Sequence, residues 1–391
     1  MAKRVGMEVS IAAAEAVKQA NVDVISAYPI TPQTHVVEHL SELVANGELD
    51  AEFIPVESEH SALSVCLGSS AAGARSFTCT SSQGLALMSE ITYIAAPLRL
   101  PIVMIISNRT LSAPLSIWND HSDVMSIRDC GWIQVFTENG QEVYDHVFFA
   151  YRLAEDKEVL FPVIINMDGF ILSHVIEPIE MIEQEKIDQF LPPYQPLHRL
   201  HPDHPVTMGA FAMPGVFAET KKAHEAALRS SMSRILETWK AFGNMTGRYY
   251  NPIETYQAED TETLLVTMGS FGETASVAVD KMREEGRAVG LVKIRLWRPF
   301  PFDAFKKATL KAKQLVVIDR AVSVGGPGGP VASEVKAAIY GEEKRPSVYN
   351  FVAGISGRDV TPSDYIKMVD KAEIEIEEGN KEGYEIYGVR E

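Results

Sequence analysis

Cysteine is scarce in this chain of 391 residues, where it occurs three times, as Cys66, Cys79 and Cys130. None of the three lies within three residues of another, so the sequence has no CxxC segment of the kind that binds zinc or an iron–sulfur cluster. Isolated cysteines in a reducing compartment are usually free thiols in the core. We therefore expect any cluster that takes part in electron transfer to lie on another chain.

Long apolar runs and an excess of positive charge are also missing. No stretch reaches the roughly 18 uncharged apolar residues that span a bilayer. The N-terminal segment has no cleavage-site pattern, and we expect a cytoplasmic protein without a membrane partner. Asp and Glu number 53 against 36 Lys and Arg, which gives a net charge of −17. This charge would repel phosphates, so a nucleic-acid partner is not expected.

Short apolar runs alternate with helical patterns along most of the chain. Strands are predicted at 22–27, 51–56, 76–80, 101–107, 163–167, 264–268, 290–294, 315–318 and 348–352. Helices are predicted at 10–20, from 34 onward, and at 57–72, 85–96, 218–242, 273–285 and 331–339. Strands separated by helices of about 10–15 residues indicate βαβ units and a parallel sheet.

The alternation stops near residue 190, where a Pro- and His-bearing segment to residue 205 predicts an irregular connection before the helix at 218–242. We therefore predict an α/β protein with two doubly wound α/β domains, residues 1–250 and 258–391, joined by a helical bridge. The acidic run at 370–391 is expected to be a solvated tail.

The first loop of chemical interest runs from Ala27 to Thr34. In it, Pro29 precedes Thr31 by two residues and Pro32 follows it directly. Two prolines fix the backbone there, so the Thr31 hydroxyl is presented on a rigid turn. An ordinary helix entry explains the same residues, with Thr31 as the cap and Pro32 in the first turn.

The second loop, Val56 to Ala62, places Glu59 between a buried strand and a helix rich in small residues. Burial and the neighbouring Glu57 could tune the pKa of such a carboxylate. Simple capping of the helix by Ser58 or Glu59 is the alternative.

The third loop follows the apolar run that ends at Ser107 and contains Arg109. A guanidinium at a strand end is suited to a bidentate grip on a carboxylate. A structural ion pair with Asp120 or Asp123 is the alternative. The group from Asp120 to Asp123 also resembles metal ligands, but a hydrogen-bonded loop is the favoured interpretation.

In the second half, the Gly- and Pro-rich loop 325–330 lies between a predicted strand and a predicted helix. The N-terminus of that helix could bind a phosphate. The loop lacks GxGxxG spacing and a P-loop lysine, so a tight packing turn is the favoured interpretation.

Taken together, these segments resemble one family, the 2-oxoacid:ferredoxin oxidoreductases, and specifically the α chain of the multi-subunit pyruvate enzymes. The matching segments are 28–34 (YPITPQT), 57–62 (ESEHSA), 80–85 (TSSQGL), 108–114 (NRTLSAP), 118–123 (WNDHSD), 128–132 (RDCGW), 168–170 (DGF), 269–270 (GS), 298–301 (RPFP) and 357–360 (GRDV). They occur in the family's order over nearly the whole chain.

The resemblance implies a thiamine pyrimidine-binding domain followed by a transketolase C-terminal-like domain. The family's catalytic glutamate, which hydrogen-bonds N1′ of thiamine diphosphate, corresponds to Glu59. Its arginine for the substrate carboxylate corresponds to Arg109, and its substrate-contacting threonine corresponds to Thr31. Pro29 and Thr31 are expected to lie beside the cofactor. The resemblance thus favours the catalytic interpretation of all three loops.

Thiamine enzymes hold the diphosphate through Mg²⁺ with a Gly-Asp-Gly segment, which is missing from this sequence. The resemblance therefore implies half an active site, with the Mg²⁺–diphosphate half on a β subunit and the [4Fe–4S] clusters on partner subunits, among them γ and a ferredoxin-like δ. The expected reaction is oxidation of pyruvate with coenzyme A while ferredoxin is reduced. A branched-chain 2-oxoacid or 2-oxoglutarate as substrate, or a non-catalytic structural role, stays open.

Overall fold

A computed structural model describes residues 3–380 and 383–390. Its strands are β1 (Lys3–Glu8), β2 (Val24–Ala27), β3 (Glu52–Pro55), β4 (Ser76–Thr80), β5 (Ile102–Asn108), β6 (Ile133–Phe136), β7 (Val163–Asp168), β8 (Ile176–Met181), β9 (Ile253–Tyr256), β10 (Thr263–Met268), β11 (Val289–Ile294), β12 (Leu296–Arg298), β13 (Gln314–Asp319), β14 (Ser347–Val352) and β15 (Tyr384–Ile386). Its α-helices are α1 (Val9–Gln19), α2 (Thr34–Ala45), α3 (Glu59–Ala72), α4 (Ser82–Ala95), α5 (Ser122–Ser126), α6 (Gly140–Ala154), α7 (Gln184–Phe190), α8 (Pro214–Ser230), α9 (Met232–Thr246), α10 (Phe271–Glu284), α11 (Phe302–Thr309), α12 (Pro330–Ile339) and α13 (Pro362–Glu377).

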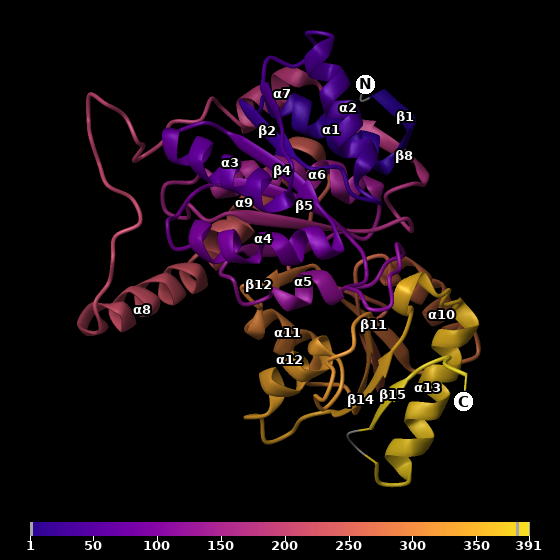
Figure 1. Cartoon of the computed structure of the whole chain (residues 1–391). Helices are drawn as coiled ribbons and strands as arrows, with labels where there is room; N and C mark the ends of the chain where they lie inside the picture. The colour runs from indigo at the N-terminus through magenta and orange to yellow at the C-terminus, as the bar shows by residue number, and fades with distance from the viewer. Residues whose placement is uncertain (1–2, 381–382, 391) are drawn as a thin grey trace.

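Two open sheets form the framework of the molecule (Figure 1). The first has the strand order β12-β6-β7-β5-β4-β2-β3, and all its pairs are parallel except β12–β6. The second has the order β15-β14-β13-β10-β11-β9, with only β9 antiparallel to its neighbour. Helices cover the sheets, which confirms the prediction of two doubly wound α/β units.

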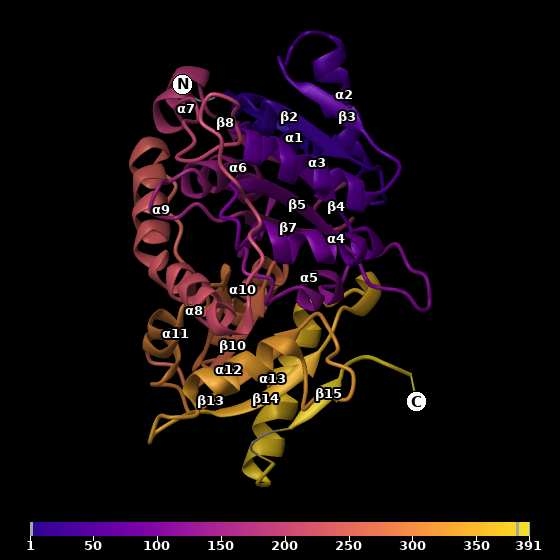
Figure 2. The same cartoon turned by 60° about the vertical axis from the view of Figure 1, so that its left-hand side comes forward.

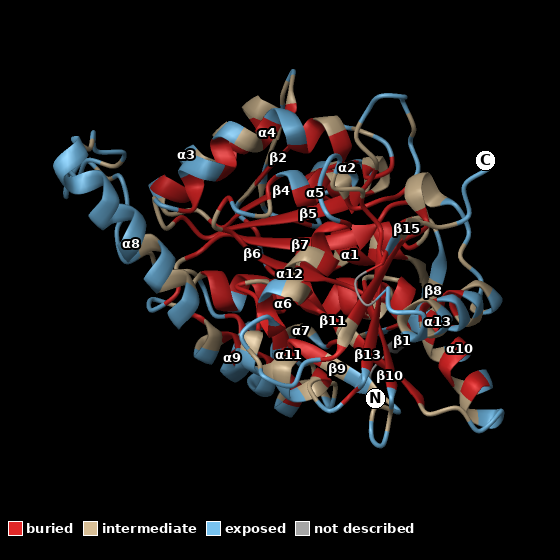
Figure 3. Ribbon diagram, turned by 90° about the horizontal axis from the view of Figure 1, so that it is seen from below, coloured by how far each residue is buried: buried red, intermediate tan, exposed pale blue. Residues whose placement is uncertain are grey.

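The central strands are buried on both faces because helices pack on each side of a parallel sheet. Every residue of β4, β5, β7, β10 and β13 is buried. Figure 3 shows this buried layer running through both sheets beneath exposed helix surfaces. One apolar cluster continues from Leu63 and Met104 in the first unit to Val266 and Val317 in the second, so the two units share a core.

The proposed division at residues 250–258 is crossed by one short strand. β9, at 253–256, already belongs to the second sheet, whereas β12, at 296–298, returns to pair with β6 of the first. We keep 1–250 and 258–391 as the proposed domains. β9 is assigned to the second domain, and β12 of the second domain adds a strand to the sheet of the first.

Two local predictions were wrong. The single helix predicted at 218–242 is two helices, α8 and α9, which meet at Ser231. There the Ser231 hydroxyl donates to the Leu228 carbonyl oxygen at 2.7 Å, and such side-chain bonds to a preceding turn bend helices. The acidic run 370–391 is not a free tail in its described part. α13 continues to Glu377 and buries Ala372, and β15 pairs with β14.

The three cysteines are buried free thiols, as predicted. In the part of the chain that the structure describes, no helix is both long and apolar enough to cross a membrane.

Candidate active site

The three predicted loops lie at one edge of the first sheet. Thr31 follows β2, Glu59 follows β3 and Arg109 follows β5, and these strands are parallel members of the same sheet. The carboxyl ends of parallel strands meet at one edge, which is where α/β proteins bind ligands. The structure therefore brings the predicted residues to the edge at which chemistry is expected.

Arg109 and Thr31 are in direct contact. The Nη1 atom of Arg109 donates to the carbonyl oxygen of Thr31 at 2.9 Å, and its Nε donates to the carbonyl oxygen of Ser116 at 2.8 Å. The arginine is 6% exposed, and this burial lowers its pKa, an effect that the nearby Asp123 opposes. Two backbone carbonyls thus fix the direction of a buried guanidinium.

The predicted alternative for Arg109, an ion pair, is wrong. Within the described residues no carboxylate lies within 4.0 Å of its guanidinium. Asp123 instead accepts from the Arg109 backbone N–H at 3.0 Å. A guanidinium has five N–H donors, and Arg109 uses two of them, so three are left for a ligand.

Thr31 does not cap the following helix, so that alternative is also wrong. The N-cap position of α2 is Gln33, and the helix begins at Thr34. Pro29 and Thr31 are both exposed. Their turn is consequently free to be covered by another molecule.

Glu59 is the first residue of α3 and is 7% exposed. Ser58, not Glu59, caps the helix, because its hydroxyl oxygen accepts from the Ser61 N–H at 3.3 Å. Glu57, by contrast, is exposed, and its carboxylate accepts from the Ser61 hydroxyl, which lowers its pKa. Of the two neighbouring glutamates, Glu59 is the one held in a low-dielectric environment.

Gly84, near the start of α4, makes room for the Glu59 carboxylate. A Cβ atom at Gly84 would lie 2.7 Å from Glu59 Oε1 and 2.4 Å from Thr80 Oγ1. The hydroxyls of Thr80 and Ser81 are buried without a hydrogen-bond partner among the described residues. Glu59 thus offers a buried carboxylate beside hydroxyls that have no partner, and the glycine leaves space next to it. These groups fit a nitrogen-rich ring such as the aminopyrimidine of thiamine diphosphate, which could hydrogen-bond to them.

Asp123 joins the loop that carries Arg109 to the helix that borders Glu59. Its Oδ2 accepts from the backbone N–H groups of Ser82, at 3.1 Å, and Arg109, at 3.0 Å. Its Oδ1 accepts from Asn108 Nδ2 at 3.1 Å and from the Val124 N–H at 2.7 Å. Burial raises its pKa to about 6, although these hydrogen bonds favour the charged form. The sequence had assigned Asp123 no such role.

The 120–123 segment is a hydrogen-bonded loop, as favoured. Asp120 Oδ1 accepts from the Ser122 N–H at 2.9 Å, and His121 Nε2 lies 2.7 Å from Asp168 Oδ1. Among the residues that the structure describes, the acidic group whose oxygens lie close enough for a metal ion is a different one, Glu138, Glu142 and Glu254. Lys293 and Arg295 already pair with it.

The glycine loop before α12 is a packing turn. Asp319 accepts from the Val331 N–H at 2.7 Å and from the Ala332 N–H at 3.0 Å, so a carboxylate of the chain itself occupies the helix N-terminus. A Cβ atom at Gly329 would lie 2.1 Å from Asp319 Cγ. The phosphate interpretation is thereby excluded.

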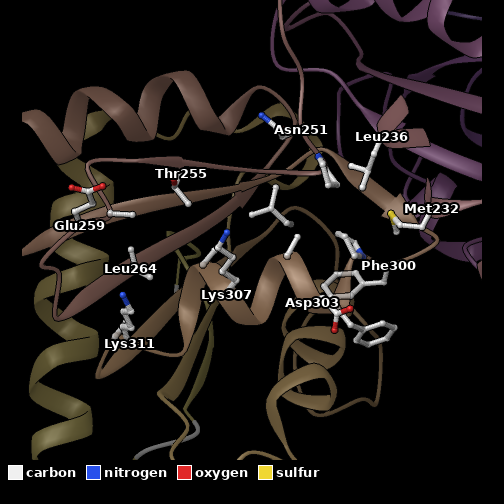
Figure 4. Close-up of a pocket in the computed structure, with 18 of the residues that line it drawn as sticks. Met232, Leu236, Asn251, Thr255, Glu259, Leu264, Phe300, Asp303, Lys307 and Lys311 are labelled. Atoms are coloured by element: carbon white, nitrogen blue, oxygen red, sulfur yellow. The ribbon is translucent and has the colours of Figure 1, made fainter. Parts of the chain in front are cut away.

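A groove of about 1100 Å³ lies elsewhere, where α9, β9 and α11 approach one another (Figure 4). Leu236, Thr255, Phe300 and Lys307 are among the residues that line it, whereas Thr31, Glu59 and Arg109 are not. The groove is therefore separate from the predicted site.

Two family models match the chain. One, for the pyruvate flavodoxin/ferredoxin oxidoreductase thiamine-diphosphate-binding region, covers residues 15–239, and the other, for pyruvate:ferredoxin oxidoreductase core domain II, covers 261–365. The chain belongs to this oxidoreductase family. The predicted resemblance to the α chain of the pyruvate enzymes is confirmed. The prediction that the chain is a subunit of a 2-oxoacid:ferredoxin oxidoreductase is confirmed with it.

Relatives in the family align over almost the whole chain. Pyruvate synthase subunit PorA of Methanothermobacter thermautotrophicus is 47% identical over 93% of each chain. PorA of Pyrococcus horikoshii is 48% identical over 97% of this chain and 96% of its own. Ketoisovalerate oxidoreductase subunit VorA of Pyrococcus horikoshii is 44% identical over 94% and 93%.

Two solved structures share the fold. A 2-oxoglutarate:ferredoxin oxidoreductase from Magnetococcus marinus matches with a TM-score of 0.71 and 19% identity, covering 94% of this chain and 65% of that one. A split-gene transketolase matches with a TM-score of 0.56 and 14% identity over 94% and 98%. Both show that this chain shares its α/β fold with these two structures.

Proposed function

We propose that this chain supplies the pyrimidine half of the active site of a pyruvate synthase. In the proposed reaction pyruvate and coenzyme A give acetyl-CoA, CO₂ and one proton, while two ferredoxins each accept one electron. The observation that carries the proposal is the buried guanidinium of Arg109, which is held by two carbonyls, faces no carboxylate among the described residues and has donors left for an anionic substrate.

Arg109 binds the carboxylate that every 2-oxoacid carries next to its reacting carbonyl. The unused donors are one on Nη1 and two on Nη2, and this end of a guanidinium makes two parallel hydrogen bonds to a carboxylate. Thr31, fixed by its contact with Arg109, places its hydroxyl beside the same substrate. Recognition of the carboxylate alone does not separate pyruvate from other 2-oxoacids.

Pyruvate is the proposed substrate because five PorA relatives, at 46–48% identity, are somewhat more similar than VorA at 44%, and two further PorA chains stand at 43% and 44%. A 2-oxoglutarate enzyme would need a cation for the distal carboxylate, and Thr31 offers none. A branched 2-oxoacid is the second candidate, which the identity of VorA supports.

Thiamine diphosphate, when bound, supplies the carbon nucleophile and the electron sink for decarboxylation. Glu59 is the residue that would hold a proton at N1′ of the aminopyrimidine, because it is buried beside the space left by Gly84. Pro29 and Thr31 would border the cofactor from the exposed turn after β2. We assign Mg²⁺ and the diphosphate to a β subunit, and the [4Fe–4S] clusters and ferredoxin contact to the γ and δ subunits, all in the cytoplasm.

The test compares the purified chain with the assembled complex in 2-oxoacid-dependent viologen reduction. The chain alone is expected to be soluble and inactive, and the complex is expected to turn over pyruvate faster than 2-oxoisovalerate or 2-oxoglutarate. Robust activity of the chain alone would contradict the half-site assignment. Faster turnover of 2-oxoisovalerate would contradict the choice of pyruvate and leave the half-site assignment standing.

A further inference from the structure

The segment between β5 and α5, which carries Arg109, meets the second unit at the boundary between the two units (Figure 2). Its residues 112–115 are all exposed, so the body of the first unit does little to hold this stretch. The carbonyl oxygen of Ser116, which accepts from Arg109 Nε at 2.8 Å, follows directly. The position of that carbonyl therefore depends on the contacts that Ser116 and the residues after it make.

Two hydrogen bonds attach this part of the segment to a short 3₁₀ helix, η1 (Ile355–Gly357), between β14 and α13 of the second unit. The hydroxyl groups of Ser116 and Ser356 share one of them, at 2.5 Å. In the other, the Gly357 N–H donates to the Asn119 carbonyl oxygen at 2.7 Å. The second unit thus holds the end of a loop whose start carries the buried arginine.

The backbone of this turn is unusual at Ser356. Its φ is +55° and its ψ is 41°, in the left-handed region that residues with a Cβ atom seldom adopt. Such conformations persist where the surroundings hold them, and they gather at functional sites. Glycine would adopt this conformation at less cost. What serine adds at position 356 is the hydroxyl that meets Ser116.

We propose that Ser356 is a positioning residue for substrate binding, which acts through Ser116 to set the direction of the Arg109 guanidinium. The path has two contacts, from hydroxyl to hydroxyl and from the Ser116 carbonyl to Arg109 Nε. A guanidinium is planar and its five N–H groups keep a fixed geometry. When Nε and Nη1 are held by the carbonyls of Ser116 and Thr31, the direction of the remaining donors is fixed as well.

The proposal rests on the proposed role of Arg109 as the ligand of the substrate carboxylate, and it gives the second unit a part in binding the substrate. Ser356 itself need not touch the substrate. Its effect is therefore expected on the affinity for the 2-oxoacid and not on the affinity for thiamine diphosphate, because Glu59 lies on a different loop, at the start of α3.

The test is steady-state kinetics of Ser356→Ala in the assembled complex, with titration of thiamine diphosphate. Alanine keeps the Cβ atom and removes only the hydroxyl. KM for pyruvate is expected to rise about 2- to 12-fold, which at 1.4 kcal/mol per factor of ten corresponds to the roughly 0.5–1.5 kcal/mol net strength of one hydrogen bond. The value of kcat should be unchanged, because loss of an interaction that binds substrate and transition state equally raises KM alone.

Two further backgrounds show whether Ser356 acts through the path described. In Arg109→Met and in Ser116→Ala, the added change Ser356→Ala should leave kcat/KM where it was, since contacting residues that act together are not additive. Ser276→Ala is the matched control. It removes a half-buried hydroxyl of the second unit that bonds within its own helix, to the Gly272 carbonyl oxygen at 2.9 Å, and KM should not change.

An unchanged KM in Ser356→Ala would overturn this proposal and leave the role of Arg109 standing. A rise of the same size in the Arg109→Met background, or in the control Ser276→Ala, would do the same, because the effect would then not pass through the arginine. If Arg109→Met itself kept a normal kcat/KM, the proposed function of Arg109 would be wrong, and Ser356 would have no substrate ligand to position.

Discussion

The Nη1 atom of Arg109 lies 2.9 Å from the carbonyl oxygen of Thr31, although the two residues are 78 positions apart in the chain. The contact joins the loops after β5 and β2, which flank β4 in the sheet. Because Arg109 faces no carboxylate of the described chain, its charge is available to a ligand. A change at Arg109 is therefore expected to act on substrate binding and on the turn that carries Thr31.

Arg109→Met keeps the bulk of the side chain and removes its charge and donors. Loss of a charged hydrogen-bonding partner at a desolvated site costs on the order of 2–5 kcal/mol, or about 30- to several-thousand-fold in kcat/KM. Steady-state kinetics of the mutant complex on pyruvate, with titration of thiamine diphosphate, measures this. An unchanged KM together with lost cofactor affinity would make Arg109 a cofactor ligand.

Glu59→Gln keeps the shape of the side chain and removes its ability to hold a proton at the cofactor. Turnover is expected to fall by the roughly 10²–10⁴-fold that is typical of lost acid–base catalysis, with assembly and cluster content unchanged. Glu57→Gln is the matched control, because Glu57 is exposed and should tolerate the change. If Glu57→Gln were the inactive variant, the catalytic role would belong to that residue.

Gly84→Ala tests the space beside Glu59. The new Cβ atom would lie 2.7 Å from Glu59 Oε1, a separation that forces the carboxylate to move, and we expect at least a tenfold loss of kcat. Gly68→Ala in α3 is the control, since nothing lies within 4 Å of its Cβ position. Alanine in place of glycine inside a helix stabilises by roughly 0.5–1 kcal/mol. Equal activity of the two variants would argue against a crowded site at Gly84.

Most central strands of both sheets could be predicted from the sequence, because strands buried on both faces are continuous apolar runs. The buried strand β6 was not predicted, since its four residues include the polar Gln134. β4 begins and ends at the predicted residues, β7 ends one residue later than predicted, and β5 is shifted by one residue at both ends. The edge strands β1, β9, β12 and β15 were not predicted. They are three to six residues long, and most are only partly buried, so no apolar run marks them.

The site could be predicted in part for a similar reason. Thr31, Glu59 and Arg109 follow predicted strands, and strand ends can be found from local patterns. Asp123 and Gly84 were missed because their roles depend on contacts across the sequence, such as the hydrogen bond from Ser82 to Asp123 over 41 positions. No local spacing reports such a contact. The packing turn at 325–330 was already favoured from the sequence, and the position of Asp319 at the start of α12 supplied its physical reason.

Asp123→Asn is expected to disturb the geometry that links the two loops. The buried Oδ2 accepts from two backbone N–H groups. An amide NH₂ at either oxygen position would face hydrogen-bond donors, so buried N–H groups would lose their acceptor. Each such unpaired group costs about 1–3 kcal/mol of stability. We expect a higher KM for pyruvate and a lower kcat in the complex. Ser126→Ala, which removes a hydroxyl bonded to the Asp123 backbone at 2.6 Å, is the milder comparison.

The pKa of Asp123 also predicts a pH effect on stability. Its folded-state pKa of about 6 lies above the usual aspartate value of about 3.8, so the folded state binds the proton more tightly. Ionising this group in the folded state therefore lowers the free energy of unfolding by on the order of 3 kcal/mol. The loss develops as pH rises from about 4 to 6 and is complete above that range. In Asp123→Ser, which cannot ionise, the thermal unfolding temperature should show less of this fall between pH 4.5 and 7. An identical pH profile in both proteins would contradict the raised pKa.

The last prediction concerns the buried contact that joins the carboxyl ends of the two sheets. Asp168, at the end of β7, accepts from Arg320 Nη1 at 2.7 Å and from the Ser270 N–H at 2.9 Å. Burial alone would raise the pKa of Asp168, but Arg320 and His121 lower it well below its usual range. Its stabilising effect is thus present above the unfolded pKa of about 4 and is lost as pH falls further.

Arg320→Met leaves Asp168 buried with a weaker set of partners, and removal of one member of a buried ion pair costs about 3–5 kcal/mol. The loss should be large at pH 7 and smaller near pH 4, because burial then favours the protonated form of Asp168 in the variant. Thermal unfolding of the purified variant at both pH values, with the wild type alongside, measures the difference. Arg287→Met, which breaks the more exposed pairs with Asp370 and Glu373, should cost about 1 kcal/mol or less. A loss at Arg320 no larger than at Arg287, or one that grows as pH falls, would show that this contact does not hold the two units together through the charge of Asp168.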